Sequence, residues 1–499
     1  MQGKLYLCIH GHFYQPPREN PWTGEIEKQI SASPFHNWNE RIYQECYKPN
    51  SDAIIIDETG KVLERINNYE YINFNFGPTL LNWIRKKHRQ TYAKIIQADR
   101  NSIAANNGHG NAIAQAFNHI IMPLADKEDK ITQVKWGLAD FKFHFGRDAE
   151  GMWLPETAVN EETLEVLINE KIKYIILDTS QAEKCREQGN ELWIDVSTGD
   201  INPKIPYRYF LNEEKHIDIF FYEGLVSRSL AFEDLAYSSE RMFTFLDMTK
   251  IPNCAEDQLI SIATDGETFG HHKHFADRTI AYLLRELAQK NKYYVTNFGG
   301  YLASHPPKWE VKIKKGKNGL GTSWSCVHGV SRWYEDCGCH TGGSEEWNQK
   351  WRAPLRNALN YLRDELKIIY TETGNKFLKD VSKARNNYIE IILEDSLKSK
   401  EKFFKTNSKK KLSEDEKEII INLLEIQKFS MYMFTSCGWF FSDISGIETI
   451  KILEYAKIAL VYGQKISGKN LETKFLEILS EAKSNIPEKN TGKEIYQSL

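Results

Sequence analysis

Residues 259–275 read LISIATDGETFGHHKHF, an apolar run that leads into a cluster of polar side chains. The run from Leu259 to Ala263 is nearly continuous in apolar residues, which is typical of a parallel strand covered on both faces. An Asp-Gly pair can mark a hairpin turn, but no alternating strand follows it. We therefore interpret the segment as a strand end that carries a functional site. Its candidate residues are Asp265, Glu267, His271, His272 and His274.

Similar apolar runs recur up to about residue 300, with amphipathic stretches between them. This rhythm predicts an α/β domain built on parallel strands. In a barrel of such strands the carboxyl ends share one edge, so polar residues that follow different runs converge there. The runs lie at 5–9, 71–76, 174–178, 217–222, 259–264 and 293–298.

The chain changes character after Pro306-Pro307. A Lys/Gly-rich bridge and a Cys/Trp/Gly-rich stretch come first, and apolar residues then recur at helical spacing. We expect a catalytic α/β domain over 1–305, a connecting loop region over 306–345 and a helical domain over 346–499. The predicted helical segments are 357–370, 388–397, 416–434 and 447–460, and the Lys/Ser-rich piece 398–413 is interpreted as a solvated loop.

Composition excludes several classes of partner. The 499 residues include 65 Lys and Arg against 68 Asp and Glu, a net charge of −3 that gives no basic field for nucleic acid. No segment approaches the ~18 apolar residues that span a bilayer, and the apolar stretch near the amino terminus is too short for a signal peptide. We expect a cytoplasmic protein whose eight cysteines are reduced thiols or metal ligands.

A second carboxylate of interest lies in GMWLPETA (151–158), where Glu156 follows a strand-like run. The plain alternative is a glutamate in the first turn of a helix, favoured by the helix dipole. Two carboxylates on different strand ends are, however, the minimal equipment for cleaving a glycosidic bond, provided that one stays ionised and the other keeps a proton. Glu267 could raise the pKa of Asp265, and Trp153 could offer a flat face to a sugar ring.

Two histidine clusters are further candidates. His10 and His12 alternate in CIHGHFYQPP (8–17), a spacing that suits either a metal site or turn histidines bonded to backbone. His109 and His119 lie among amide side chains in 106–124, a composition suited to binding hydroxyl groups.

Taken together, these segments resemble glycoside hydrolase family 57. The resemblance rests on segments that match four signature regions in order: HGHFYQPPRENPW (10–22), FNHIIMPL (117–124), GMWLPETA (151–158) and TDGETFGHH (264–272). Further segments resemble a subgroup with an additional carboxyl-terminal domain of uncharacterised role: 35–50, 66–83, 323–343, 347–359 and 437–449.

The resemblance implies an α/β fold, an incomplete (β/α)7 barrel followed by a mainly α-helical carboxyl-terminal domain. It also implies a retaining mechanism on α-glucans or maltooligosaccharides without a cofactor, with Glu156 as nucleophile and Asp265 as general acid/base. Many members open with His-Gln-Pro, whereas here His10 and His12 precede Gln15 by several residues, so either histidine could bind substrate.

The family's activities include hydrolysis, glucan transfer and branching. Two other functions are also consistent with the sequence. One is a metal-dependent deacetylase or mannosidase-like hydrolase with His10, His12 and Asp265 as ligands. The other is a glucan-binding protein without turnover.

Two more expectations concern the carboxyl-terminal half. Trp439 lies among aromatics between glycines in 437–449, and we expect it near the barrel mouth as a stacking platform. The segment 326–340 holds three cysteines and two histidines, but only Cys337 and Cys339 are paired, by a spacing shorter than zinc sites usually show. We expect a metal-free, glycine-rich loop with reduced thiols that contributes Trp324, His328 or Trp333 to the sugar site.

Overall fold

A computed structural model describes residues 3–499 and contains a ring of seven parallel strands. Each strand neighbours the next in chain order, and the last one pairs with the first. The sequence predicts most of these strands because their residues are buried on both faces. They are β1 (Leu5–Phe13), β4 (Asn73–Phe76), β5 (Ala114–Gln115), β6 (Met152–Trp153), β7 (Tyr174–Asp178), β11 (His216–Tyr222) and β12 (Gln258–Asp265).

The ring is incomplete between β11 and β12. No ladder joins these two strands in the described chain. Glu223 N, just beyond the end of β11, donates to Ser261 O at 2.8 Å, and Ser261 Oγ donates to Phe221 O at 3.5 Å. β13 (Tyr293–Val295) pairs with the first residues of β1. The observed architecture is thus the incomplete α/β barrel that the resemblance implies.

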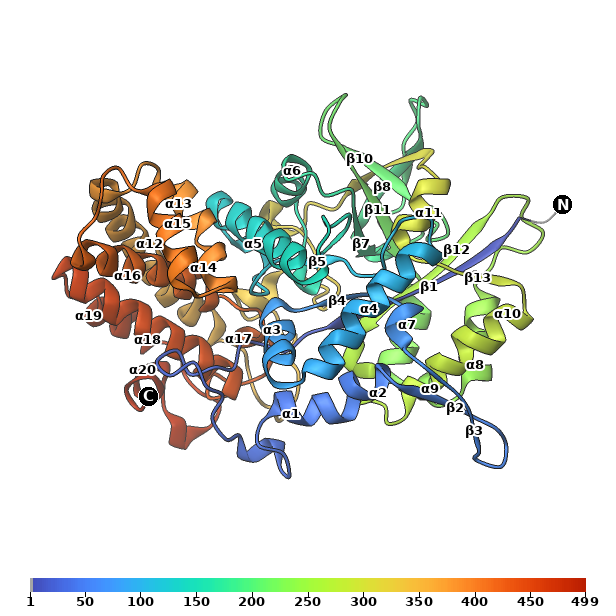
Figure 1. The fold of residues 1–499 in the computed structure, drawn as a ribbon, viewed down its shortest axis with the longest axis horizontal. Coiled ribbons are helices and arrows are strands. Elements are labelled where there is room, and N and C mark those ends of the chain that lie inside the picture. The colour runs from blue at the N-terminus through green and yellow to red at the C-terminus, as the bar shows by residue number, and fades with distance from the viewer. Residues whose placement is uncertain (1–2) are drawn as a thin grey trace.

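Helices cover the outside of the ring (Figure 1). The longest is α5 (Lys127–Phe145), which packs on β5 and begins with Asp126 capping the amide of Asp129. The others are α1 (Trp38–Ile42), α2 (Lys48–Asn50), α3 (Pro78–Lys87), α4 (Arg89–Ala105), α6 (Glu161–Asn169), α7 (Gly224–Phe232), α8 (Ser239–Met248), α9 (Ala276–Tyr282), α10 (Ala288–Lys290) and α11 (Phe298–Ser304).

A second sheet extends from β7 and β11 in the order β7-β11-β10-β14-β8-β9. In this sheet, β14 pairs with β8 and β10. We expected a connecting loop region to begin at residue 306, but its first part is a strand of the sheet of the first domain. The added strands are β8 (Ala182–Glu187), β9 (Ile194–Asp195), β10 (Tyr207–Phe210) and β14 (Trp309–Ile313), and β2 (Ala53–Ile56) and β3 (Val62–Ile66) form a separate hairpin.

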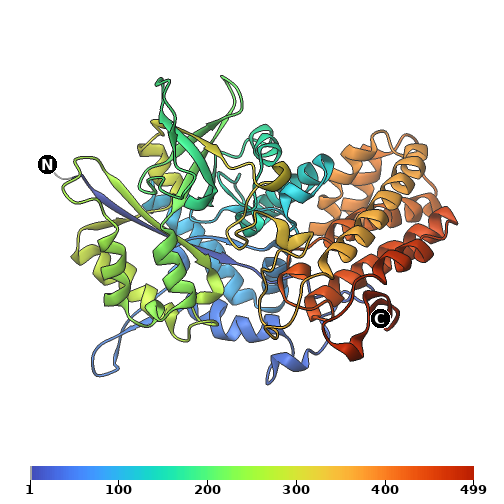
Figure 2. The same ribbon diagram turned by 180° about the vertical axis from the view of Figure 1, so that it is seen from behind.

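The carboxyl-terminal part is helical, as expected, and gathers at the end of the molecule opposite the amino terminus (Figures 1 and 2). The expected loop over 398–413 is wrong in its first half, where α15 forms because Ser396 caps it and Phe403 is buried. The helices are α12 (Arg352–Phe377), α13 (Val381–Asn387), α14 (Ile389–Leu393), α15 (Leu397–Asn407), α16 (Glu414–Tyr432), α17 (Cys437–Phe440), α18 (Ile447–Ser467), α19 (Glu472–Leu479) and α20 (Gly492–Gln497).

Hydropathy gives no helix that could cross a bilayer within residues 3–499. The largest cluster of buried apolar side chains runs from the barrel helices into the helical domain, and two smaller clusters lie around Trp153 and beneath the β2–β3 hairpin. Trp136 on α5 lies at this junction, where its indole nitrogen donates to the carbonyl oxygen of Asn386 at 3.1 Å.

Candidate active site

The two predicted catalytic carboxylates follow strands of the ring at its carboxyl edge. Glu156 lies in the turn after β6, and Asp265 is the last residue of β12, in register with His12 on β1. Glu156 is half-buried and Asp265 is exposed, so both can be reached from solvent. Sequence reasoning therefore placed both residues on the edge where parallel barrels carry their active sites.

Glu156 has a left-handed backbone, with φ 57° and ψ 21°, and the next residue, Thr157, has φ 50°. Consecutive non-glycine residues at positive φ are rare, and such strain clusters at functional sites. The helix that follows, α6, begins only at Glu161 and is capped by Asn160. Glu156 therefore does not lie in the first turn of α6. The alternative interpretation, a glutamate favoured there by the helix dipole, is wrong.

Two donors from the 323–325 segment converge on one oxygen of Glu156. Trp324 Nε1 donates to Oε2 at 3.0 Å, and Ser325 Oγ donates to the same atom at 2.7 Å. Burial raises the pKa of Glu156, while these two hydrogen bonds and the charge of Arg332 act in the opposite direction. The donors favour the ionised carboxylate, which is the form a nucleophile needs.

The pKa of Asp265 is raised as well, but no hydrogen bond opposes the rise as it does at Glu156. Desolvation by the surrounding protein and the nearby negative charge of Glu156 raise the pKa of Asp265 to about 7, although water reaches the carboxyl group. Glu267 is buried, and its pKa rises to about 8 through burial and the charge of Asp265. Glu267 accepts hydrogen bonds from Tyr47 Oη at 2.5 Å and from Tyr14 N at 3.0 Å, so it braces the turn after β12.

A buried network of histidines and amides lines the ring beside these carboxylates. Asn75 faces His12 Nδ1 with Nδ2 at 2.9 Å and Oδ1 at 3.2 Å, and His12 Nε2 lies 3.1 Å from His119 Nε2. Burial lowers the pKa of His10 to about 4 and that of His12 to about 3. These imidazoles are therefore neutral hydrogen-bonding groups at neutral pH.

The hypothesis of a metal site at His10, His12 and Asp265 does not fit this geometry. His10 Nδ1 lies 2.7 Å from Asn73 Oδ1 and Nε2 lies 3.2 Å from Asn75 Oδ1, and a neutral imidazole can donate to one of these oxygens. His10, His12 and Asp265 do not converge as a group of metal ligands in the described part of the chain. Within residues 3–499, the one group of three or more converging metal-ligand side chains lies elsewhere, at Cys326, His328, Cys337 and Cys339.

A comparison with known families decides the assignment of the barrel. The model for glycosyl hydrolase family 57 matches residues 7–314, well over half of the chain. The chain belongs to this family. A second model, described as a domain of unknown function (DUF3536), matches residues 347–499.

Curated relatives within family 57 match only in part. Alpha-amylase 1 of Dictyoglomus thermophilum is 23% identical over 270 residues, which are 54% of this chain and 32% of the relative. The 4-alpha-glucanotransferase of Thermococcus litoralis is 24% identical over 139 residues, 28% of this chain and 18% of the relative. The matches thus span a third or less of the length of these relatives.

Solved family 57 structures share the fold over nearly the whole chain. An exo-type maltose-forming amylase from Pyrococcus sp. ST04 has a TM-score of 0.65 at 14% identity, over 96% of this chain and 82% of that one. A branching enzyme from Thermococcus kodakaraensis has a TM-score of 0.55 at 14% identity, over 98% and 93%. At this identity the likeness shows the fold alone, and it includes the helical domain.

The helical domain reaches the site through the segment before α17. Ser436 Oγ lies 2.7 Å from His119 Nδ1, and Ser436 N donates to the carbonyl oxygen of His119 at 2.9 Å. Cys437 Sγ lies 3.9 Å from the hydroxyl of Tyr14, whose ring stacks on His119 at 3.8 Å between centroids. This family 57 site is therefore assembled from both parts of the chain.

The structure corrects three expected substrate contacts. His109 pairs with Glu150 at 2.8 Å before the start of β6, at the opposite edge of the ring from Glu156. Trp153 is fully buried, with the rings of His10 and His12 stacked against it, so it offers no free face to a sugar. Trp439 is also fully buried and packs against Phe434, so it cannot be a stacking platform.

The remaining candidates lie closer to the expected places. His271 and His272 are on the turn beyond Asp265, where His271 pairs with Glu45. Trp324 is half-buried and contacts Glu156 directly. Gln15 is buried and accepts a hydrogen bond from Arg18 at 2.9 Å, and His328 is exposed beside the cysteines.

Sequence reasoning missed the amide and serine partners of the site. The alternation in NFNF (73–76) points Asn73 and Asn75 to the same face, a signal that could have placed both inside the ring. Gln115, which accepts from Asn75 Nδ2 at 2.8 Å, lies on a strand of two residues that no period reveals. Ser325 and Ser436 had no recognisable pattern, because their partners are more than 160 residues away.

Proposed function

We propose that this protein is a retaining enzyme that acts on α-glucans such as maltooligosaccharides, with Glu156 as the nucleophile and Asp265 as the general acid/base. The observation that carries the proposal is the contrast between these two carboxyl groups. Burial raises the pKa of both groups, but at Glu156 two hydrogen bonds oppose the rise and favour the charged form, whereas at Asp265 burial and the charge of Glu156 act together and raise the pKa to about 7. That division of roles is what a double displacement at a glycosidic bond requires.

In the first step, an oxygen of Glu156 forms a bond to the anomeric carbon as the glycosidic bond breaks. Asp265 gives its proton to the departing oxygen. In the second step, ionised Asp265 takes a proton from the acceptor, whose oxygen attacks the anomeric carbon and releases Glu156. Water as acceptor gives hydrolysis, and a glucan hydroxyl gives transfer.

Substrate class is proposed from the family, whose relatives carry the names amylase, glucanotransferase and branching enzyme. We also propose that the protein acts in the cytoplasm, since its eight cysteines form no disulfide among themselves. Half-buried Trp324, beside the nucleophile, is the aromatic surface on which we place a sugar ring.

Product analysis with maltoheptaose as the only substrate tests the proposal. Shorter sugars alone indicate hydrolysis, a ladder of shorter and longer sugars indicates 1,4-transfer, and new 1,6 linkages indicate branching. Any of these supports an enzyme on α-glucans. Binding of maltoheptaose without products after long incubation would favour a glucan-binding protein and overturn the proposal.

The two catalytic roles are tested by substitution. Glu156→Ala should lower kcat by roughly 10³-fold or more, and added azide should restore turnover by forming a glycosyl azide of inverted anomeric configuration. Asp265→Asn should lower kcat by about 10²–10⁴-fold and remove the alkaline limb, near pH 7, from the activity profile.

A matched control is Glu161→Ala, which removes an exposed carboxylate five residues beyond Glu156 and should leave turnover unchanged. If Glu156→Ala forms products at the wild-type rate without azide, another group is the nucleophile.

A further inference from the structure

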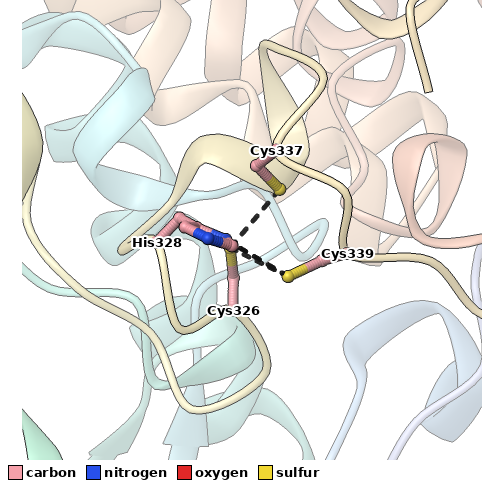
Figure 3. A group of neighbouring side chains, drawn as sticks. All are labelled: Cys326, His328, Cys337 and Cys339. Carbon is pink, nitrogen blue, oxygen red and sulfur yellow. Dashed lines mark hydrogen bonds between the residues drawn. The ribbon is translucent and has the colours of Figure 1, made fainter. Parts of the chain in front are cut away.

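Four potential metal ligands converge in the loop region between the barrel and the helical domain. They are the side chains of Cys326, His328, Cys337 and Cys339, and their ligand atoms all lie within 4.8 Å of one another. Figure 3 shows the three sulfur atoms and the imidazole directed toward a common centre. The group comes from two short chain segments that face each other, each with one residue between its two ligands.

Distances within this group match a tetrahedral ion site. Cys326 Sγ lies 3.8 Å from Cys337 Sγ and 3.9 Å from Cys339 Sγ, and Cys339 Sγ lies 3.5 Å from His328 Nδ1. A tetrahedral zinc with bonds of about 2.3 Å to sulfur and 2.0–2.1 Å to nitrogen separates sulfurs by about 3.8 Å and sulfur from nitrogen by about 3.5 Å. A disulfide would need sulfurs about 2.05 Å apart.

We propose that Cys326, His328, Cys337 and Cys339 form a structural zinc site with three thiolate ligands and one imidazole ligand. Four protein ligands close the tetrahedron and leave no position for water or substrate, which is the pattern of a structural site. Soft thiolates with one imidazole select zinc over calcium, magnesium or manganese.

The expectation of a metal-free loop rested on the short spacing between Cys337 and Cys339. In an extended chain, two residues separated by one other lie on the same face but about 6–7 Å apart, so their side chains run parallel and do not converge on one ion. Here the residue between them is Gly338 with φ 78°, a left-handed conformation that turns the chain and allows both sulfurs to approach one centre. Local spacing alone could not show this turn or the return of Cys326.

The loop is held from outside by a buried arginine. Arg352, at the start of α12, is fully buried and donates from Nη1 to the carbonyl oxygen of Cys339 at 2.7 Å. Three thiolates and one zinc ion carry a net charge of −1, and the guanidinium supplies a positive charge beside them. Such a partner is the outer support that metal sites commonly have.

The site has a direct structural link to the catalytic carboxylate. Cys326 immediately follows Trp324 and Ser325, the two residues that donate to Glu156. A zinc ion on Cys326 would fix the end of this segment and thereby hold both donors in place. Its role is to position the loop, and it does not contact the reacting atoms.

Metal content of the full-length protein gives the first test. Protein produced with zinc in the medium and purified without chelator should contain about one zinc ion per chain by mass spectrometry of the elements. Cys337→Ser/Cys339→Ser should lower the content to near zero, whereas Cys254→Ser, which changes a half-buried cysteine outside the group, should keep it. Zinc-free wild-type protein with reduced thiols, or unchanged zinc in the double variant, would overturn the proposal.

A second test needs no variant. Cobalt(II) added to metal-free protein should give the intense visible bands and thiolate charge-transfer band of a tetrahedral, sulfur-rich site. With zinc bound, Cys326, Cys337 and Cys339 should resist alkylation, and chelator should expose all three, while Cys254 reacts equally in both states. Absence of the cobalt bands, or equal alkylation in both states, would contradict the site. Neither readout depends on turnover, so both remain valid if the proposed enzymatic function is wrong.

Discussion

Glu156 and Thr157 are held in a backbone conformation that costs of the order of 1–3 kcal/mol per residue. Surrounding contacts fix this turn from two sides. Trp324 N donates to the carbonyl oxygen of Glu156 at 3.0 Å, and Gln181 Nε2 donates to the carbonyl oxygen of Thr157 at 2.9 Å. The turn therefore aims the Glu156 carboxylate at the edge of the ring, and its position depends on the 323–325 segment.

Ser325→Ala should move the acidic limb of the pH profile of kcat/KM to higher pH. The Ser325 hydroxyl stabilises ionised Glu156, so its removal raises the pKa of this proposed nucleophile. A hydrogen bond to a charged group is worth about 1.5–3 kcal/mol, so we expect kcat/KM to fall by roughly 10–100-fold. Initial rates across the pH range measure both effects.

Ser325→Thr keeps a hydroxyl group and should restore most of the activity and the wild-type acidic limb. An unchanged acidic limb in Ser325→Ala would show that the hydrogen bond to Glu156 does not tune the nucleophile.

Glu267→Gln should remove a pH-dependent loss of stability. Burial and the charge of Asp265 raise the pKa of Glu267 from 4.5 to about 8. Between these values the unfolded chain has released this proton while the folded chain retains it, so stability falls as pH rises and levels off above about pH 8. Calorimetric Tm values between pH 5 and 9 should fall less steeply in the variant; equal slopes would argue against a protonated Glu267.

At the level of elements, apolar runs predicted the longer strands of the ring, but not β8 to β10 and β14, which extend the second sheet, nor the β2–β3 hairpin. β7 covers the expected 174–178, and β11 and β12 differ from expectation by a residue at each end or fewer. β5 and β6 have two residues each, too few for any period, so the ring could not be traced from the sequence alone. Asp265 could still be identified as a candidate, because it is the polar residue that ends the long apolar run of β12.

Gly137 on α5 shows how closely a helix must approach the ring. A Cβ atom at this position would lie 2.0 Å from the carbonyl oxygen of Gln115 on β5. Gly137→Ala should therefore push α5 away from β5 and destabilise the protein by about 1–3 kcal/mol, although alanine normally favours a helix interior. Urea unfolding measures the change.

Gly224→Ala is the matched control, because its Cβ would lie at ordinary distances from its neighbours, 3.5 Å from Asp178 Oδ2 and 3.9 Å from Thr179 Oγ1. We expect a change near zero there. Equal stability of the Gly137→Ala protein would mean that the contact between α5 and β5 can relax without cost.

At the level of the whole molecule, the barrel and the helical domain share one apolar core and one site. Asn118 Nδ2 donates to the carbonyl oxygen of Met431 at 2.9 Å, and the next residue, His119, contacts Ser436. These contacts join positions more than 300 residues apart, so no local pattern in the sequence predicts them. The likeness to family 57 structures over nearly the full chain agrees with this shared architecture.

The strongest test of that coupling is the buried ion pair between the two parts. Arg385 Nη1 on α13 contacts Asp129 Oδ1 on α5 at 2.8 Å, with both side chains under a tenth exposed. Arg385→Met leaves the Asp129 carboxylate buried without its partner and should cost about 3–5 kcal/mol, whereas Arg385→Met/Asp129→Asn should recover part of that loss. Lys142→Met, which breaks an exposed pair, should cost at most about 1 kcal/mol. Since the core is continuous, we expect calorimetry to show one transition that shifts as a whole in Arg385→Met. A second, unshifted transition for the barrel would show that the helical domain folds and unfolds independently of the site it helps to build.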